Sequence, residues 1–153
     1  MRENDVRTAR EGTPVILHCS YEEIQALARG TQVFLTGDRG DVTVMAPPRE
    51  VAAVEELARR LGSELSVSSY RELEDIESGL DAVTDALGSE MDAMVVATHA
   101  AGEEAISAYF DYANALTVLA RARELKGEMR ALIELMTGEP VTEMSAREVS
   151  FPD

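Results

Sequence analysis

The chain has 153 residues, 45% of them apolar and 28% charged, which is the composition of a folded globular protein rather than a disordered one. It carries 29 acidic residues against 14 basic ones, and the net charge of −15 excludes nucleic acid and anionic membranes as expected partners, because both would repel it. No uncharged stretch is longer than Ala93–Gly102, which is far shorter than the ~20 residues of a membrane-spanning helix. The length predicts one domain at 13–138, between a flexible N-terminus at 1–12 and a C-terminal tail at 139–153.

The kinds of charged residue and the single cysteine indicate a compartment. Lys126 is the only lysine, and the other 13 basic residues are arginines. An acidic excess with so little lysine is typical of a cytoplasm that accumulates salt, where a Debye length of about 3 Å at molar salt screens self-repulsion. A GC-rich genome would also favour arginine. Cys19 is the only cysteine, which fits a reducing cytoplasm, and the charged segment Met1–Arg10 makes a secretory leader unexpected.

The first elements are predicted from a strand-length apolar segment and a helix start. Val15–Cys19 is compact and apolar, which predicts a strand. Ser20 and Glu23 follow at the spacing of a capping box, which predicts the start of a helix. Gly30 is then the predicted end of that helix.

A β-hairpin and a second helix are predicted next. Gln32–Thr36 and Asp41–Met45 flank a loop that contains glycine, which is the pattern of a hairpin. Pro47 and Pro48 stop the second of these strands and predict the first turn of a helix, which Gly62 ends.

A further strand and the clearest helix follow. Leu65–Ser68 is a short strand candidate. Ser69 and Glu72 repeat the capping spacing, and the apolar residues beyond them recur every three or four positions. This pattern predicts a helix that Gly88 closes.

The next segment decides the fold class. Ala93–Thr98 fits either a buried strand or more helix. Glu103 and Glu104 suit the first turn of a new helix, where the helix dipole favours negative charge, so Ala93–Thr98 is interpreted as a separate strand. The new helix is expected to run to about Leu125, and Met129–Met136 favours helix over strand by its composition.

The alternation of strands and helices predicts an α/β fold with a mostly parallel sheet covered by helices and one β-hairpin. The alternative is an α+β fold. It has a ferredoxin-like N-terminal half in the order β-α-β-β-α-β, ending near Ser69, and a helical C-terminal half. The strand predicted at Ala93–Thr98 distinguishes the two fold classes, because only the α/β fold requires it.

Residues suited to catalysis or metal binding lie at the ends of two predicted strands. His18 and Cys19 end the first strand and His99 follows another, and ligands bind at the carboxyl ends of strands in α/β sheets. His18, Cys19, His99 and Glu103 together would suit zinc, and Cys19 with His99 would alternatively form a nucleophilic pair. The favoured interpretation is structural, with a buried cysteine and two hydrogen-bonded histidines. The sequence requires no cofactor, since it lacks the glycine-rich phosphate-binding patterns.

One resemblance bears on function. The run Val95–Tyr112, VVATHAAGEEAISAYFDY, with the closing SFPD, resembles uncharacterised proteins of halophilic archaea, some of which are similar to degenerate RecA- or KaiC-type ATPase domains. Because the phosphate-binding loop of such ATPases is missing here, the resemblance implies scaffolding or regulation rather than nucleotide hydrolysis.

Two functions from different classes are therefore expected. The leading hypothesis is a non-enzymatic interaction or regulatory protein of a halophilic cytoplasm, a homodimer or the partner of another protein. It rests on the wide apolar face of Ile106–Ala120 and the methionines of Met129–Met144. The alternative is a small-molecule or metal-binding enzyme with its site at His18, Cys19 and His99.

Overall fold

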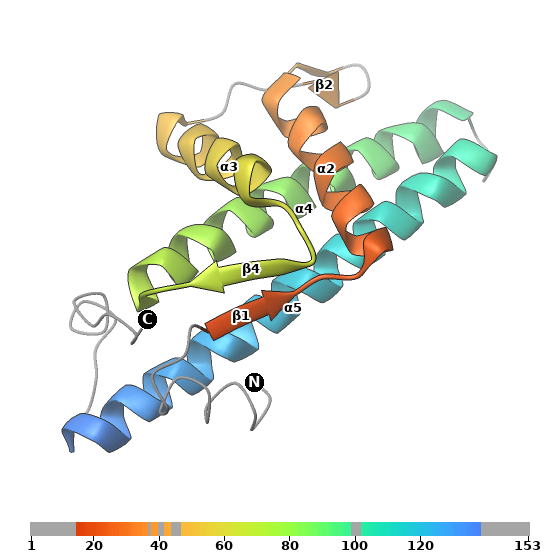
Figure 1. The fold of residues 1–153 in the computed structure, drawn as a ribbon. Helices are drawn as coiled ribbons and strands as arrows, with labels where there is room; N and C mark the ends of the chain where they lie inside the picture. Colours follow the sequence, from red (N-terminus) through yellow and green to blue (C-terminus); the bar gives the residue numbers. More distant parts are fainter. Residues whose placement is uncertain (1–14, 37, 40–41, 44–46, 99–101, 139–153) are drawn as a thin grey trace.

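The computed structural model describes residues 15–36, 38–39, 42–43, 47–98 and 102–138 (Figure 1). Most of these residues are helical. In chain order the elements are β1 (Val15–His18), α2 (Tyr21–Thr36), β2 (Asp38–Arg39), β3 (Val42–Thr43), α3 (Pro48–Arg60), β4 (Glu64–Val67), α4 (Tyr70–Thr98) and α5 (Glu103–Thr137).

The predicted α/β fold with a mostly parallel sheet is wrong. The described strands form two separate antiparallel pairs, β1 with β4 and β2 with β3. The ferredoxin-like alternative is also wrong, because its four strands would share one sheet. Figure 1 shows the reason: β1 lies at one end of α2 and β2 at the other. A helix of 16 residues spans about 24 Å, which keeps the two pairs apart.

The first helix is longer than predicted. Its capping box forms as expected, with the Ser20 N–H donating to Glu23 Oε1 at 2.7 Å and the Glu23 N–H donating to Ser20 Oγ at 3.2 Å. However, α2 continues through Gly30 to Thr36, so the strand predicted at Gln32–Thr36 is wrong. Gly30 is buried against α4, where a β-carbon would overlap Val83 Cγ1. This glycine permits two helices to approach and does not end one.

Helix α4 is also longer than predicted. α4 passes through Gly88 and reaches Thr98, so the strand predicted at Ala93–Thr98 is wrong. A β-carbon on Gly88 would stand 3.0 Å from Tyr112 Cε2 in α5. The segment that was expected to complete a parallel sheet therefore belongs to a helix of 29 residues.

The last helix is the longest element. α5 begins at Glu103 as predicted and includes the Met129–Met136 segment, but it passes the expected end near Leu125. Its 35 residues span about 52 Å. It ends at Gly138, which has φ 72° and donates its N–H to the Glu134 carbonyl at 2.8 Å. α4 and α5 run antiparallel and side by side, and Figure 1 shows the pair extending beyond α2.

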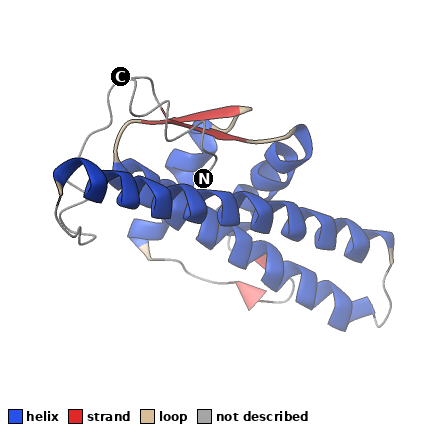
Figure 2. Cartoon of the chain, turned by 90° about the horizontal axis from the view of Figure 1, so that it is seen from below, coloured by secondary structure: helices blue, strands red, loops and turns tan. Residues whose placement is uncertain are grey.

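The β1–β4 pair packs on the helices through one face. Val15 lies opposite Val67 and Leu17 opposite Leu65, and all four side chains are buried. Figure 2 shows this pair lying along one side of the long helices.

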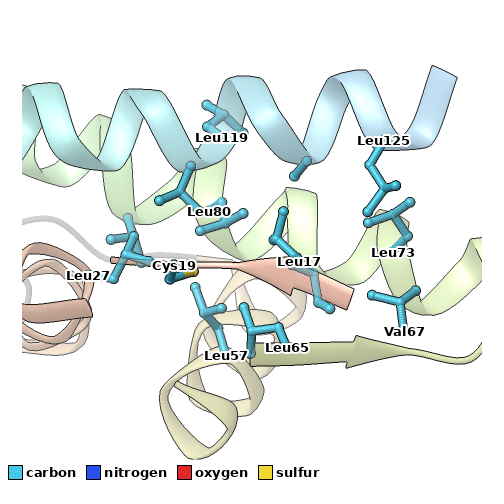
Figure 3. Packing of buried hydrophobic residues seen from close by; sticks show 14 of the residues in the cluster. Leu17, Cys19, Leu27, Leu57, Leu65, Val67, Leu73, Leu80, Leu119 and Leu125 are labelled. Carbon is cyan, nitrogen blue, oxygen red and sulfur yellow. The ribbon is translucent and has the colours of Figure 1, made fainter. Parts of the chain in front are cut away.

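The core joins all the large elements. Figure 3 shows Leu17 of β1, Leu57 of α3 and Leu80 of α4 within one apolar cluster, with Leu119 of α5 above them. Each such side chain contributes roughly 1.5–3 kcal/mol by its burial. The two strands are therefore held by the helices rather than by a larger sheet.

Candidate functional site

The strand-end residues Cys19 and His18 lie in opposite environments. The His18 side chain is exposed, whereas Cys19 is 7% exposed and donates its N–H to the Ser63 carbonyl at 3.0 Å. Burial and the negative charge of Glu23 raise the pKa of Cys19 to about 11, against the lowering effect of Arg121. A thiol with this pKa stays protonated at neutral pH, so it is a poor nucleophile and a poor metal ligand.

The structure separates Glu103 from this strand end. Arg121 donates a hydrogen bond to the His18 carbonyl at 2.8 Å, and Glu103 lies 18 positions earlier on the same helix. Eighteen residues of helix span about 27 Å. His99 lies outside the described residues. Within the described ranges, no three His, Cys, Asp or Glu side chains are grouped as metal ligands would be.

An ion pair occupies the strand end. Arg121 Nη1 donates to Glu23 Oε1 at 2.9 Å, and its Nη2 donates to Glu23 Oε2 at 2.8 Å. Glu23 is only 4% exposed. Burial alone would raise the pKa of its carboxyl, but hydrogen bonds from Arg121 and Ser20 outweigh burial and hold the pKa below its ordinary value of 4.5. The pair joins β1, the start of α2 and the middle of α5, which is a structural role.

The end of the neighbouring strand repeats the arrangement. Arg60 donates to the Ser66 carbonyl and pairs with Glu72 at 2.6 Å, while the Glu72 N–H donates to Ser69 Oγ at 3.1 Å. The register of the pair directs the His18 and Ser66 carbonyls away from the partner strand. Each outer edge of the sheet therefore meets an arginine, which satisfies a backbone acceptor that strand pairing leaves open.

The sequence alone does not predict these two junctions, although it contains a signal for them. The pattern Ser-Tyr-x-Glu occurs at Ser20–Glu23 and again at Ser69–Glu72, each time two residues after a strand ends. Both copies form a helix cap whose glutamate also binds an arginine. The cap is visible from local spacing, whereas the arginine comes from a different element each time.

Two open hollows lie between α3 and α4. Their volumes are about 450 and 640 Å³. Arginine and carboxylate side chains line both, and no described lining residue is a cysteine or a histidine. The charged residues on their walls are Arg49, Glu56, Arg60, Arg71, Glu72, Glu74, Asp75, Glu77 and Asp81. Serine hydroxyls also line the hollows, Ser69 in the first and Ser78 in the second.

The outer face of α5 gathers four of the seven large apolar side chains that are exposed among the described residues. Four large side chains on it are between 40% and 59% exposed, and smaller residues fill the positions between them. We define this outer face by seven residues at helical spacing: Ile106, Tyr109, Phe110, Ala113, Leu116, Thr117 and Ala120. In the view of Figure 2, no described helix or strand lies in front of α5.

Charge is nearly absent from this part of α5. Residues 105–120 include one charged residue, Asp111, in a chain that is 28% charged. Asp111 does not add charge to the outer face, because it pairs with Arg29 of α2 at 3.2 Å. Tyr109 and Phe110 contact each other edge to face, with ring centroids 5.9 Å apart. The sequence predicts an apolar face at Ile106–Ala120. The structure leaves four of its large side chains exposed, but it buries Leu119.

Comparison of the chain with known protein families, with curated proteins and with solved structures returns no match. None of the helices, over the residues the structure describes, combines the length and apolarity needed to cross a membrane.

Proposed function

We propose that the chain is a non-enzymatic interaction protein that self-associates through the outer face of α5. One observation carries the proposal. Ile106, Tyr109, Phe110 and Leu116 are 48%, 56%, 59% and 40% exposed on a surface that is otherwise strongly acidic. Exposed apolar patches of this kind mark contact surfaces.

Charge favours a second copy of this chain as the partner that covers the outer face. A net charge of −15 makes two copies repel each other wherever acidic surfaces meet. The outer face avoids this repulsion, because its seven residues carry no charge. A two-fold dimer brings the same patch of both copies together, so the uncharged patch of one copy meets that of the other.

The area of the face agrees with a small dimer contact. The exposed fractions of the four large side chains add up to about two fully exposed side chains, which is an area of roughly 400 Å². Two copies that cover them would bury roughly 800 Å², and Ala113, Thr117 and Ala120 with their flanks bring the contact toward the ~1,200 Å² of the smaller specific interfaces.

The setting we propose is the cytoplasm of a salt-accumulating cell. Molar salt reduces the Debye length to about 3 Å, which removes most of the repulsion between two acidic copies while leaving the apolar contact intact. The acidic excess, the single lysine and the single cysteine all agree with this setting. The fraction of dimer should therefore rise with KCl concentration. A fraction that falls as KCl is added would contradict this setting.

Sedimentation in molar KCl tests the proposal. The wild-type chain should sediment as a dimer of 16.6 kDa subunits, and Phe110→Glu should sediment as a monomer with unchanged helix content by circular dichroism. Leu135→Glu is the matched control, because Leu135 is 69% exposed on the same helix but lies outside the outer face. A monomeric wild-type chain, or equal effects of the two substitutions, would overturn the proposal.

A further inference from the structure

We infer that the two copies of α5 pair antiparallel, with the two-fold axis passing close to Ala113. This inference rests on the proposed self-association and adds the direction and register of the contact. Ala113 is the central residue of the outer face, and its small side chain lets two helices approach closely.

The size of the side chains changes along the outer face. Ile106, Tyr109 and Phe110 fill its N-terminal part, whereas Leu116, Thr117 and Ala120 fill its C-terminal part. The bulky part is also the more exposed, since Tyr109 and Phe110 are 56% and 59% exposed and Leu116 is 40% exposed. The side chains of the outer face therefore project further from the helix in its N-terminal part than in its C-terminal part.

The positions of these residues are symmetric about Ala113. Ile106 and Ala120 each lie seven positions from it, Tyr109 and Thr117 four, and Phe110 and Leu116 three. An antiparallel pair with its axis at Ala113 brings the two members of each set to the same height along the helices. A larger side chain then meets a smaller one: isoleucine meets alanine, tyrosine meets threonine, and phenylalanine meets leucine.

A parallel pair would fit less well. Tyr109 and Phe110 would meet their own counterparts and hold the helices apart at one end. Thr117 and Ala120 would then face each other across a gap at the other end. Such a gap forfeits dispersion contacts, because protein contacts reach the density of a packed core only when large and small side chains interlock.

The two ends of the face also differ in charge. Glu103 and Arg123 each lie ten positions from Ala113, about 15 Å along the helix. Antiparallel pairing brings the Glu103 end of one copy to the height of Arg123 on the other. Parallel pairing brings Glu103 to the height of Glu103. The Arg123 side chain is 55% exposed and also pairs with Asp81 at 3.3 Å, so it lies at the rim of the proposed contact.

Disulfide trapping tests this geometry in the full chain. Cys19→Ala removes the native thiol, and single cysteines are then introduced by Ala113→Cys, Ile106→Cys or Ala120→Cys. A disulfide needs Cα atoms about 4.4–6.8 Å apart. We expect Ala113→Cys to cross-link with itself under mild oxidation in molar KCl. The Ile106→Cys chain should cross-link only when mixed with the Ala120→Cys chain, because antiparallel pairing places two copies of residue 106 about 21 Å apart.

The outcomes separate this inference from the proposed function. Self-cross-linking of both Ile106→Cys and Ala120→Cys would show a parallel dimer, which overturns the inference and leaves self-association standing. A dimer by sedimentation that yields neither the Ala113→Cys cross-link nor the mixed one also overturns it. A monomer by sedimentation overturns both. Leu135→Cys controls for random collision, because the antiparallel pair keeps its two copies far apart, so an equal yield there would count against the inference.

Discussion

The guanidinium of Arg121 donates to both carboxylate oxygens of Glu23, at 2.9 and 2.8 Å, across 98 positions of sequence. Two parallel charge-assisted hydrogen bonds of this kind are stronger than a single point contact. Because Glu23 also accepts the Ser20 N–H, one carboxylate connects the end of β1, the first turn of α2 and the middle of α5. The pair thus connects the start of α2 with α5, and Arg121 also reaches the end of β1 through its hydrogen bond to the His18 carbonyl.

Loss of Arg121 should destabilise the chain strongly. Arg121→Leu leaves the 4%-exposed Glu23 without its cation and should lower the free energy of unfolding by about 2–4 kcal/mol. Arg59→Leu is the control, since its partner Glu56 is partly exposed and the loss there should stay below about 0.5 kcal/mol. Urea unfolding at one fixed KCl concentration measures both. Similar losses in the two variants would contradict the assigned role of Arg121.

Acid should remove the contribution of Glu23. Burial raises the pKa of this carboxyl, but the hydrogen bonds from Arg121 and Ser20 prevail, so its pKa in the folded chain lies below the ordinary 4.5. As the pH falls, the unfolded chain takes up this proton first, so the stabilisation is complete above pH 4.5 and is lost below it.

The test is the urea midpoint of wild type and Glu23→Gln from neutral pH to about pH 3. The wild-type midpoint should fall more steeply below pH 4.5, because the glutamine amide of the variant does not titrate. The urea midpoint of the variant should still fall somewhat as the pH is lowered, because the pKa of Glu72 is lowered as well. Hydrogen bonds from Ser68 and the charge of Arg60 lower that pKa, against the opposing effect of burial. Parallel curves would contradict the prediction.

Replacing a helical glycine by alanine should either lower or raise the stability, depending on what surrounds that glycine. A β-carbon on Gly30 would overlap Val83 Cγ1 and lie 2.9 Å from Leu87 Cδ1, so Gly30→Ala should cost about 1–2 kcal/mol after the gain in helix propensity. Gly127 has nothing within 4 Å of the same position, so Gly127→Ala should gain about 0.5–1 kcal/mol. Thermal unfolding of both variants measures the contrast. Stabilisation by Gly30→Ala would show that α2 and α4 are not in close contact there.

The same glycines explain why the fold class could not be predicted. Local signals located the starts of α2, α4 and α5, because capping and dipole effects act within one turn of helix. Local sequence predicts that Gly30 and Gly88 end helices, whereas each of these glycines makes room for a neighbouring helix that is far away in the sequence. Short β-branched segments such as Gln32–Thr36 then fell outside the predicted helices and were assigned to strands. Only tertiary contacts distinguish a glycine at a helix crossing from one that ends a helix.

The candidate site could also be predicted only in part. The apolar outer face of α5 was visible as a stripe at Ile106–Ala120, because helical spacing is local. Its exposure was not visible, since the number of neighbours that cover a helix is a property of the whole fold. For the Arg121–Glu23 pair, the local sequence shows only the cap that contains Glu23 and does not identify the arginine. His18 and Cys19 were placed correctly at a strand end, but the helices, not a parallel sheet, surround that end.

Cys19 should be unreactive in the folded chain. Its thiol is 7% exposed, and burial with the charge of Glu23 raises its pKa to about 11. At pH 8 only about one thiol in a thousand is ionised, so labelling by a thiol reagent should be at least about 100-fold slower than in urea. Arg121→Leu should keep the labelling slow in the folded fraction, because Arg121 lowers this pKa and its loss cannot activate the thiol. Fast labelling of the folded wild-type chain would contradict the structural role of Cys19 and would favour the nucleophilic pair instead.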